Sequence, residues 1–204
     1  MPPQFFESGK KPIQHPLEKL FNASGWDILS AIEKGFRAQV DVKGKLAELF
    51  LFRQLDMLQT AGVISTLEWH DQDGVPDFSM TYKDRPLRVE CKNVRSPIRK
   101  PTTAAKRPAR PETVAPAWRV EIQKTRNQLT GGPARGYKND EFEILAVCLF
   151  NQSGKWEYLF IRTDKLQTRA EYPDYLTIMQ PVPPSAEGNW KATLKEVLVR
   201  IASP

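Results

Sequence analysis

The chain is poor in the residues that build disulfide scaffolds and zinc sites. Only two of its 204 residues are cysteines, and both Cys91 and Cys148 stand in apolar, strand-like surroundings. Its two histidines, His15 and His70, lack metal-ligand spacing and a cysteine pair to partner them. A disulfide framework and a zinc centre are therefore not expected. The sequence also has no signal peptide, no internal repeat and no apolar run long enough to cross a bilayer. We therefore expect a protein of the reducing cytoplasm without a membrane partner.

Length and charge favour a single-core protein that binds an acidic polymer. A chain of 204 residues suits one domain with a full core and a small appendage. Lysine and arginine number 30 against 24 acids, which gives a net charge of +6. This balance favours a nucleic acid as partner.

Acidic residues are absent from the stretch between residues 95 and 111, which has four prolines. Its cations include Arg99, Lys100, Lys106, Arg107 and Arg110. Such a composition cannot bury enough apolar surface to order itself, so we predict a basic flexible loop over residues 95–112. Because a cationic arm gains affinity for a phosphate backbone by counterion release, these side chains are expected to contact DNA. The alternative is a loop that only increases solubility.

Two short strands joined by a turn carry the most informative side chains, Asp77, Glu90 and Lys92. From residue 87 to residue 92 apolar and charged residues alternate, so that Glu90 and Lys92 share one face. Asp77 lies on the polar side of the preceding run, and turn formers join the two runs. An antiparallel hairpin brings Asp77 toward Glu90, and two such carboxylates can hold a divalent cation.

This pattern resembles the PD-(D/E)XK nuclease superfamily, with Pro76-Asp77 as its first element and Glu90-Cys91-Lys92 as its second. The resemblance covers about residues 43–165. It implies an α/β fold with a restriction-endonuclease-like core, in which helices flank a central mixed β-sheet of about five strands. It also implies that Asp77, Glu90 and the main-chain carbonyl of Cys91 bind Mg²⁺, for which Mn²⁺ can substitute. Lys92 would then position the attacking water. The alternative is a surface hairpin with an exposed Glu/Lys pair.

A helix is predicted upstream, over residues 43–58, with Glu48 on the apolar stripe of Leu51, Phe52 and Leu55. An acid on such a stripe is costly unless it is paired or bound to a cation. The family resemblance implies that Glu48 holds a second metal ion or its water shell. A buried pair with lysine or arginine is the alternative. The Lys-Gly-x-x-x-Glu form around Glu48 is also similar to archaeal Holliday-junction resolvases.

Another helix is predicted downstream, over residues 118–129. The resemblance implies that this helix turns polar groups, among them Gln123 and Arg126, toward the scissile phosphate. A solvated helix face is the alternative. Arg135 and Tyr137 follow in a loop rich in glycine and proline, where we expect a phosphate contact or an aromatic platform.

We expect three regions along the chain. An N-terminal helical extension takes residues 1–40, the nuclease core takes residues 41–168, and a C-terminal appendage takes residues 169–204. Within the core a first strand precedes the hairpin, and the apolar run 142–150 pairs with the run 156–161.

These observations predict a Mg²⁺-dependent endonuclease that hydrolyses phosphodiester bonds of double-stranded DNA. A restriction-type or defence-related role fits the size and the basic arm, and a homodimer is compatible with the sequence. A Holliday-junction or other structure-specific nuclease is the first alternative. The second is a non-catalytic DNA-binding module, although such a module has no need of paired carboxylates that repel phosphate.

Overall fold

The computed structural model describes residues 15–96, 118–124 and 135–202, which form two compact units, residues 1–43 and 44–204. Six of the side chains assigned to DNA contact lie outside the described residues: Arg99, Lys100, Lys106, Arg107, Arg110 and Arg126. No helix in the described ranges is long and apolar enough to cross a bilayer.

Helices make up the first unit. It contains α1 (Pro16–Phe21), α2 (Gly25–Lys34) and the start of α3 (Phe36–Thr60), which continues into the second unit. A capping box sets the start of α2, because the Ser24 hydroxyl accepts from the Asp27 amide while the Asp27 carboxylate accepts from the Ser24 amide.

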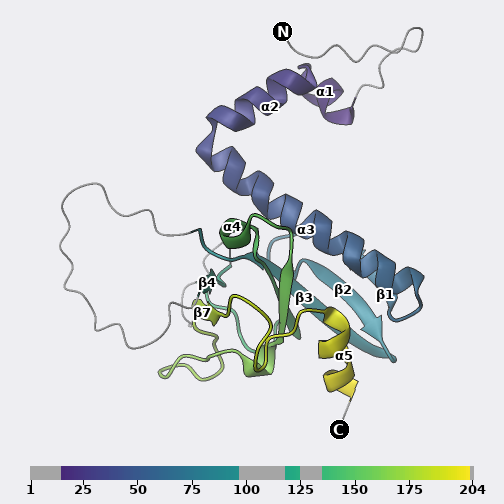
Figure 1. Cartoon of the computed structure of the whole chain (residues 1–204), viewed down its shortest axis with the longest axis vertical. Coiled ribbons are helices and arrows are strands. Elements are labelled where there is room, and N and C mark those ends of the chain that lie inside the picture. The colour runs from purple at the N-terminus through teal and green to yellow at the C-terminus, as the bar shows by residue number, and fades with distance from the viewer. Residues whose placement is uncertain (1–14, 97–117, 125–134, 203–204) are drawn as a thin grey trace, which may run out of the picture. The chain divides into compact units, whose positions relative to one another are not determined.

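The second unit is built on a mixed sheet of five strands in the order β1-β2-β3-β5-β6 (Figure 1). The strands are β1 (Ser65–Trp69), β2 (Phe78–Tyr82), β3 (Arg85–Asn93), β5 (Ile144–Cys148) and β6 (Tyr158–Arg162). β5 runs parallel to β3, and the other neighbours are antiparallel. The short helix α4 (Phe150–Ser153) follows β5, and the 3-10 turn η1 (Thr163–Lys165) follows β6. The prediction of an α/β protein with a mixed sheet of about five strands is confirmed.

The β2–β3 hairpin has the register that the alternation predicted. Phe78 pairs with Val89, so Asp77, one residue earlier, comes opposite Glu90. The turn consists of Lys83 and Asp84, whose φ angles of 47° and 60° are both left-handed. Two left-handed residues make the type I′ turn, whose twist matches that of the flanking strands. This tight turn fixes the register on which the pairing of Asp77 with Glu90 depends.

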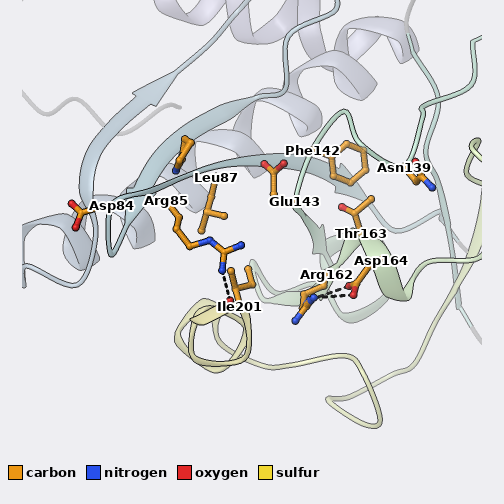
Figure 2. Close-up of a pocket in the computed structure, with 11 residues that line it drawn as sticks. Asp84, Arg85, Leu87, Asn139, Phe142, Glu143, Arg162, Thr163, Asp164 and Ile201 are labelled. Atoms are coloured by element: carbon orange, nitrogen blue, oxygen red, sulfur yellow. Dashed lines mark hydrogen bonds and ion pairs between the residues drawn. The ribbon is translucent and has the colours of Figure 1, made fainter. Parts of the chain in front are cut away.

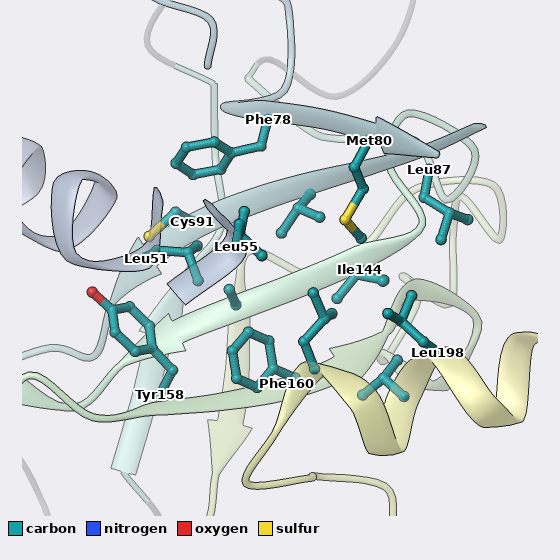
Figure 3. Close-up of a cluster of buried hydrophobic side chains, with 14 of the residues drawn as sticks. Leu51, Leu55, Phe78, Met80, Leu87, Cys91, Ile144, Tyr158, Phe160 and Leu198 are labelled. Carbon is teal, nitrogen blue, oxygen red and sulfur yellow. The ribbon is translucent and has the colours of Figure 1, made fainter. Parts of the chain in front are cut away.

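Two core clusters lie on the two faces of this sheet. The first packs Leu51 and Leu55 of α3 and Leu198 of α5 (Leu194–Ala202) against Val89 and other apolar residues of the sheet (Figure 3). The second contains the side chains of β5 that point the other way, Leu145 and Val147. All five residues of β5 are buried, as expected of a strand covered on both faces.

The helix predicted over residues 118–129 is wrong at its start. Trp118–Glu121 forms strand β4, which pairs with β7 (Met179–Val182) in a separate two-stranded sheet. The apolar residues of this run also repeat every second position, and Val120 and Ile122 are fully buried in the second core cluster. The two-residue period therefore prevails here over the helical one.

Residues after 168 belong to the same compact unit as the sheet, although the sequence set them apart as an appendage. β7 provides the partner for β4, and α5 places Leu194, Val197 and Leu198 in the first core cluster. The tail thus helps to complete the core around the strands that carry the candidate site.

Candidate active site

Asp77 is held where the chain enters β2. Its Oδ2 accepts a hydrogen bond of 2.8 Å from the main-chain amide of Cys91 on β3. Its carbonyl accepts a second bond of 2.8 Å from the amide of His70, just after β1. Bonds to both neighbouring segments fix this carboxylate beside Glu90 without the help of any cation.

The pKa of Asp77 is raised from its usual range to about 7. Burial of the carboxylate is the main cause, and the negative charge of Glu90 is the next. The Lys92 ammonium and the Cys91 amide oppose the rise without cancelling it. A pair of close carboxylates that resists full ionisation is the electrostatic setting in which a divalent cation binds favourably.

The carboxylate of Glu90 is almost fully buried, with 2% of the side chain exposed. Its Oε1 accepts from both the Lys92 ammonium and, at 2.7 Å, the Tyr137 hydroxyl. Its Oε2 is also buried but has no hydrogen-bond partner among the described residues. A buried carboxylate oxygen is costly unless a hydrogen-bond donor or a cation partners it.

Lys92 remains a cation at this site. Burial alone would lower the pKa of Lys92, but the charges of Glu90 and Asp77 outweigh burial and raise it above the usual range. The ammonium beside these two carboxylates therefore keeps its proton at neutral pH. For Tyr137, burial of the phenol raises the pKa, so the hydroxyl stays protonated and donates to Glu90.

Aromatic and polar contacts hold the ring of Tyr137 in place. Its ring meets Phe142 edge to face, with centroids 5.4 Å apart, and the Lys124 ammonium lies 5.4 Å from its centroid. Lys124 pairs in turn with Glu141. The Arg135 guanidinium donates to the carbonyl of Lys124 at 2.7 Å. Tyr137 thus belongs to the site as a hydrogen-bond donor to Glu90. Arg135 stabilises the neighbouring segment through its bond to the Lys124 carbonyl.

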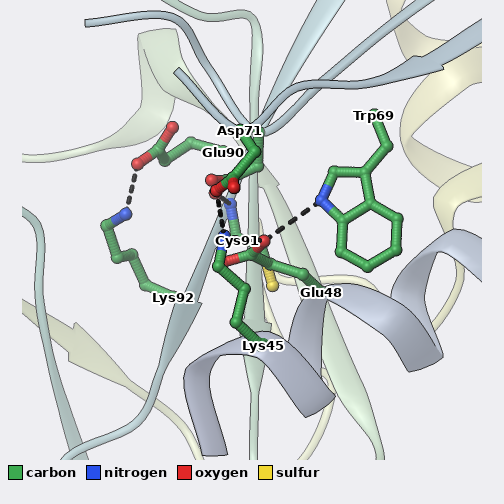
Figure 4. Close-up of polar contacts among 8 residues, drawn as sticks. Lys45, Glu48, Trp69, Asp71, Glu90, Cys91 and Lys92 are labelled. Carbon is green, nitrogen blue, oxygen red and sulfur yellow. Dashed lines mark hydrogen bonds and ion pairs between the residues drawn. The ribbon is translucent and has the colours of Figure 1, made fainter. Parts of the chain in front are cut away.

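Glu48 reaches the neighbourhood of Asp77 from α3, and its charge slightly raises the pKa of Asp77. Its Oε2 accepts from the Lys45 ammonium at 2.8 Å and from the Trp69 indole at 3.1 Å (Figure 4). Lys45 also bonds Asp71 at 2.7 Å, which ties α3 to the loop after β1. This arrangement corresponds to the ion-pair alternative for Glu48. Lys45 lies one helical turn before Glu48 in the sequence, a spacing that would have predicted the pair.

The sheet separates the two groups of polar side chains. Cys91 and the leucines of α3 share the first core cluster, and Glu90 and Lys92 alternate with Cys91 along β3. Glu90 and Lys92 therefore point to the opposite face, where Tyr137 packs against the second cluster. Figure 4 shows the Glu90–Lys92 pair apart from the meeting point of Lys45, Glu48 and Trp69.

Two further features lie outside this group. Gln123 follows β4 and donates to Glu121, the last residue of that strand. A pocket of about 450 Å³ lies at the start of β3, where Arg85 donates to the main-chain carbonyl of Ile201 in α5 (Figure 2). Arg162, which also lines the pocket, donates to the carbonyl of Arg200. Its lining does not include Asp77, Glu90 or Lys92.

The donor set suits Mg²⁺ better than zinc or calcium. The described residues contain no group of three or more His, Cys, Asp or Glu side chains that could hold a metal. Mg²⁺ needs only one or two carboxylates, because it keeps several waters and takes further ligands from phosphate oxygens. Asp77, Glu90 through its unpartnered Oε2, and the Cys91 carbonyl fit that requirement.

The comparisons with known proteins give no family for this chain. No model of a protein family matches it, and no curated protein and no solved structure is significantly similar to it.

Proposed function

We propose that this chain is a Mg²⁺-dependent phosphodiesterase that cuts DNA, with Asp77, Glu90 and Lys92 as its active centre. The fold class of a mixed sheet with flanking helices is compatible with a restriction-endonuclease-like core. Asp77, one residue before β2, lies opposite Glu90 on the antiparallel strand β3, which is the arrangement that the two acidic elements of such a site require.

The observation that carries the proposal is the asymmetric bonding of Glu90. Two donors, Lys92 and Tyr137, converge on Oε1, while Oε2 stays buried and without a partner next to a second carboxylate. A purely structural Glu/Lys pair gains nothing from an unpartnered oxygen or from a neighbouring acid with a raised pKa. Both features become favourable once a divalent cation is shared by Asp77 and Glu90.

Each residue then has a distinct task. Asp77 and Glu90 hold the cation, and the Cys91 amide keeps Asp77 in place. Mg²⁺, when bound, supplies charge that polarises the scissile phosphate and lowers the pKa of a coordinated water. Lys92, which stays protonated, orients the attacking water and stabilises the charge that develops on the phosphate.

DNA is the substrate that the charge balance favours. A net charge of +6 attracts a phosphate polymer. The acid-free stretch between residues 95 and 111 begins shortly after Lys92 in the sequence. We place five cations of that stretch, Arg99, Lys100, Lys106, Arg107 and Arg110, on the DNA backbone. A restriction-type or defence-related role remains the most specific form of the proposal.

Incubation with supercoiled plasmid tests this function. Wild-type protein should nick or linearise the plasmid with Mg²⁺ and leave it intact with EDTA. Lys92→Met should lose cleavage, whereas Lys165→Met, which removes an exposed cation on η1, should cut like wild type. A wild-type protein that binds the plasmid without cutting it in Mg²⁺ or Mn²⁺ would make the chain a binding module instead.

A further inference from the structure

The helical unit exposes an unusual amount of large apolar surface. None of the described residues 15–43 is buried. Trp26 and Phe36 are 75% and 77% exposed. Five more large apolar side chains of the unit are exposed: Leu17, Leu20, Phe21, Leu29 and Val40. An unpartnered set of this kind marks an interaction surface, because a monomeric protein seldom leaves it in water.

These side chains follow helical spacing within each helix. Leu17, Leu20 and Phe21 are three and four residues apart on α1. Trp26 and Leu29 are three apart on α2, and Phe36 and Val40 are four apart on α3. Each helix therefore presents an apolar stripe, which is the pattern that packs against another helix.

The size of this apolar surface matches one side of a stable protein interface. The seven side chains are between 42% and 77% exposed. They therefore present on the order of 800 Å² to solvent, given about 150 to 250 Å² for each aromatic and somewhat less for each aliphatic. A standard interface buries about 800 Å² per partner. The exposed apolar area is thus comparable to one side of a standard interface.

The charge of the unit selects the kind of partner. Residues 15–43 carry four acids and four cations, and so have no net charge, unlike the chain as a whole. A nucleic-acid surface or an amphipathic membrane helix would need an excess of lysine and arginine on the polar face. Mixed charges of equal number do not oppose self-association, and a two-fold axis allows one patch to meet its own copy.

We propose that the apolar stripes of residues 15–43 form the interface of a symmetric homodimer. If the apolar stripes are instead covered by another segment of the same chain or by a different protein, the purified chain is monomeric. This inference is independent of the nuclease proposal, because its test measures mass and not cleavage.

Sedimentation equilibrium of the purified full chain at micromolar concentration tests the inference. Wild type should have twice the 23.3 kDa of one chain. Trp26→Glu combined with Phe36→Glu should weaken the dimer about a hundredfold or more, since two buried aromatic anchors are lost. Met57→Glu, on α3 in the second unit, replaces a side chain that is 64% exposed and should leave the dimer intact.

Circular dichroism and a thermal melt check that the double variant keeps its folded sheet domain. A single variant, Leu29→Glu, offers a milder test, with a smaller loss in the same direction. Three results overturn the inference: a monomeric wild type, a double variant that dimerises like wild type, or a Met57→Glu variant that dissociates as much as the double variant.

Discussion

Tyr137 donates a hydrogen bond of 2.7 Å to Glu90 although 47 positions separate the two residues. The bond joins a loop to the buried carboxylate of β3, on the same oxygen that accepts from Lys92. Tyr137 therefore leaves the second oxygen as the free one. In the proposed nuclease, this makes Tyr137 a positioning residue that acts through Glu90.

Tyr137→Phe should lower cleavage about fivefold, because loss of one buried donor is worth roughly 1 kcal/mol. The substitution also removes a donor that stabilises the negative charge of the site. Protons then compete better with the metal, so metal affinity should fall most at acid pH. Tyr158→Phe is the matched control, because that hydroxyl donates to the Ala47 carbonyl at 2.6 Å inside the core. It should lose similar stability and keep its cleavage rate and pH profile. Equal effects of the two variants on the pH profile would make Tyr137 a purely structural residue.

The raised pKa of Asp77 makes the stability of the metal-free protein depend on pH. Because this pKa is about 7 in the folded chain and near 3.8 when the side chain is free, the fold favours the protonated form. The stabilisation from protonated Asp77 is complete below pH 3.8 and is lost as the pH rises through about 7. Asp77→Asn keeps an acceptor for the Cys91 amide and removes the charge.

In EDTA, Asp77→Asn should match wild type near the acid end of this range. Above neutral pH the variant should become more stable than wild type by at most about 4 kcal/mol, from 1.36 kcal/mol per pKa unit. Urea unfolding at both ends of the range measures the difference, and Mg²⁺ should reduce it by stabilising the wild type. A stability difference that does not change with pH would show that ionisation of Asp77 does not destabilise the folded protein.

Glu48→Gln should destabilise the protein modestly whether or not Mg²⁺ is present. Glu48 is 12% exposed, but its partner Lys45 is 54% exposed, so solvent screens the pair and the loss should be about 1 kcal/mol. Urea unfolding with and without Mg²⁺ measures it, and a double-mutant cycle with Lys45→Met isolates the pair. If Glu48 instead binds a second ion, the variant will be as stable as wild type in EDTA and will differ only with metal present.

The sequence predicts the sheet and the hairpin well because local periodicity decides both. Alternation on β3 places Glu90 and Lys92 on one face, and the register then follows from a two-residue turn. The strand β4 was missed because its run satisfies both a helical and a strand period. Whether this run forms a helix or a strand depends on its pairing with β7. The prolines in and after β7 argue against a strand there when the sequence is considered alone.

The partner of Glu90 had no signal in the sequence. Tyr137 lies in an irregular segment, and its contact with β3 depends on Phe142, Lys124 and Arg135, which hold that segment in place. Such contacts arise from tertiary packing, which spacing along the chain does not encode. The sequence predicts for Tyr137 only a phosphate contact or an aromatic platform, and its bond to the Glu90 carboxylate is seen only in the structure.

Binding of Mn²⁺, followed by calorimetry or by the electron paramagnetic resonance of the free ion, tests the central claim most directly. We predict one site on the wild type, with affinity that rises with pH toward 7 as Asp77 loses its proton. Asp77→Asn and Glu90→Gln should each abolish that binding, while Asp71→Asn, which removes a carboxylate that is 86% exposed, should not change it. Equal Mn²⁺ binding by wild type and Glu90→Gln would contradict the account, because the unpartnered oxygen of Glu90 would then have no cation to hold.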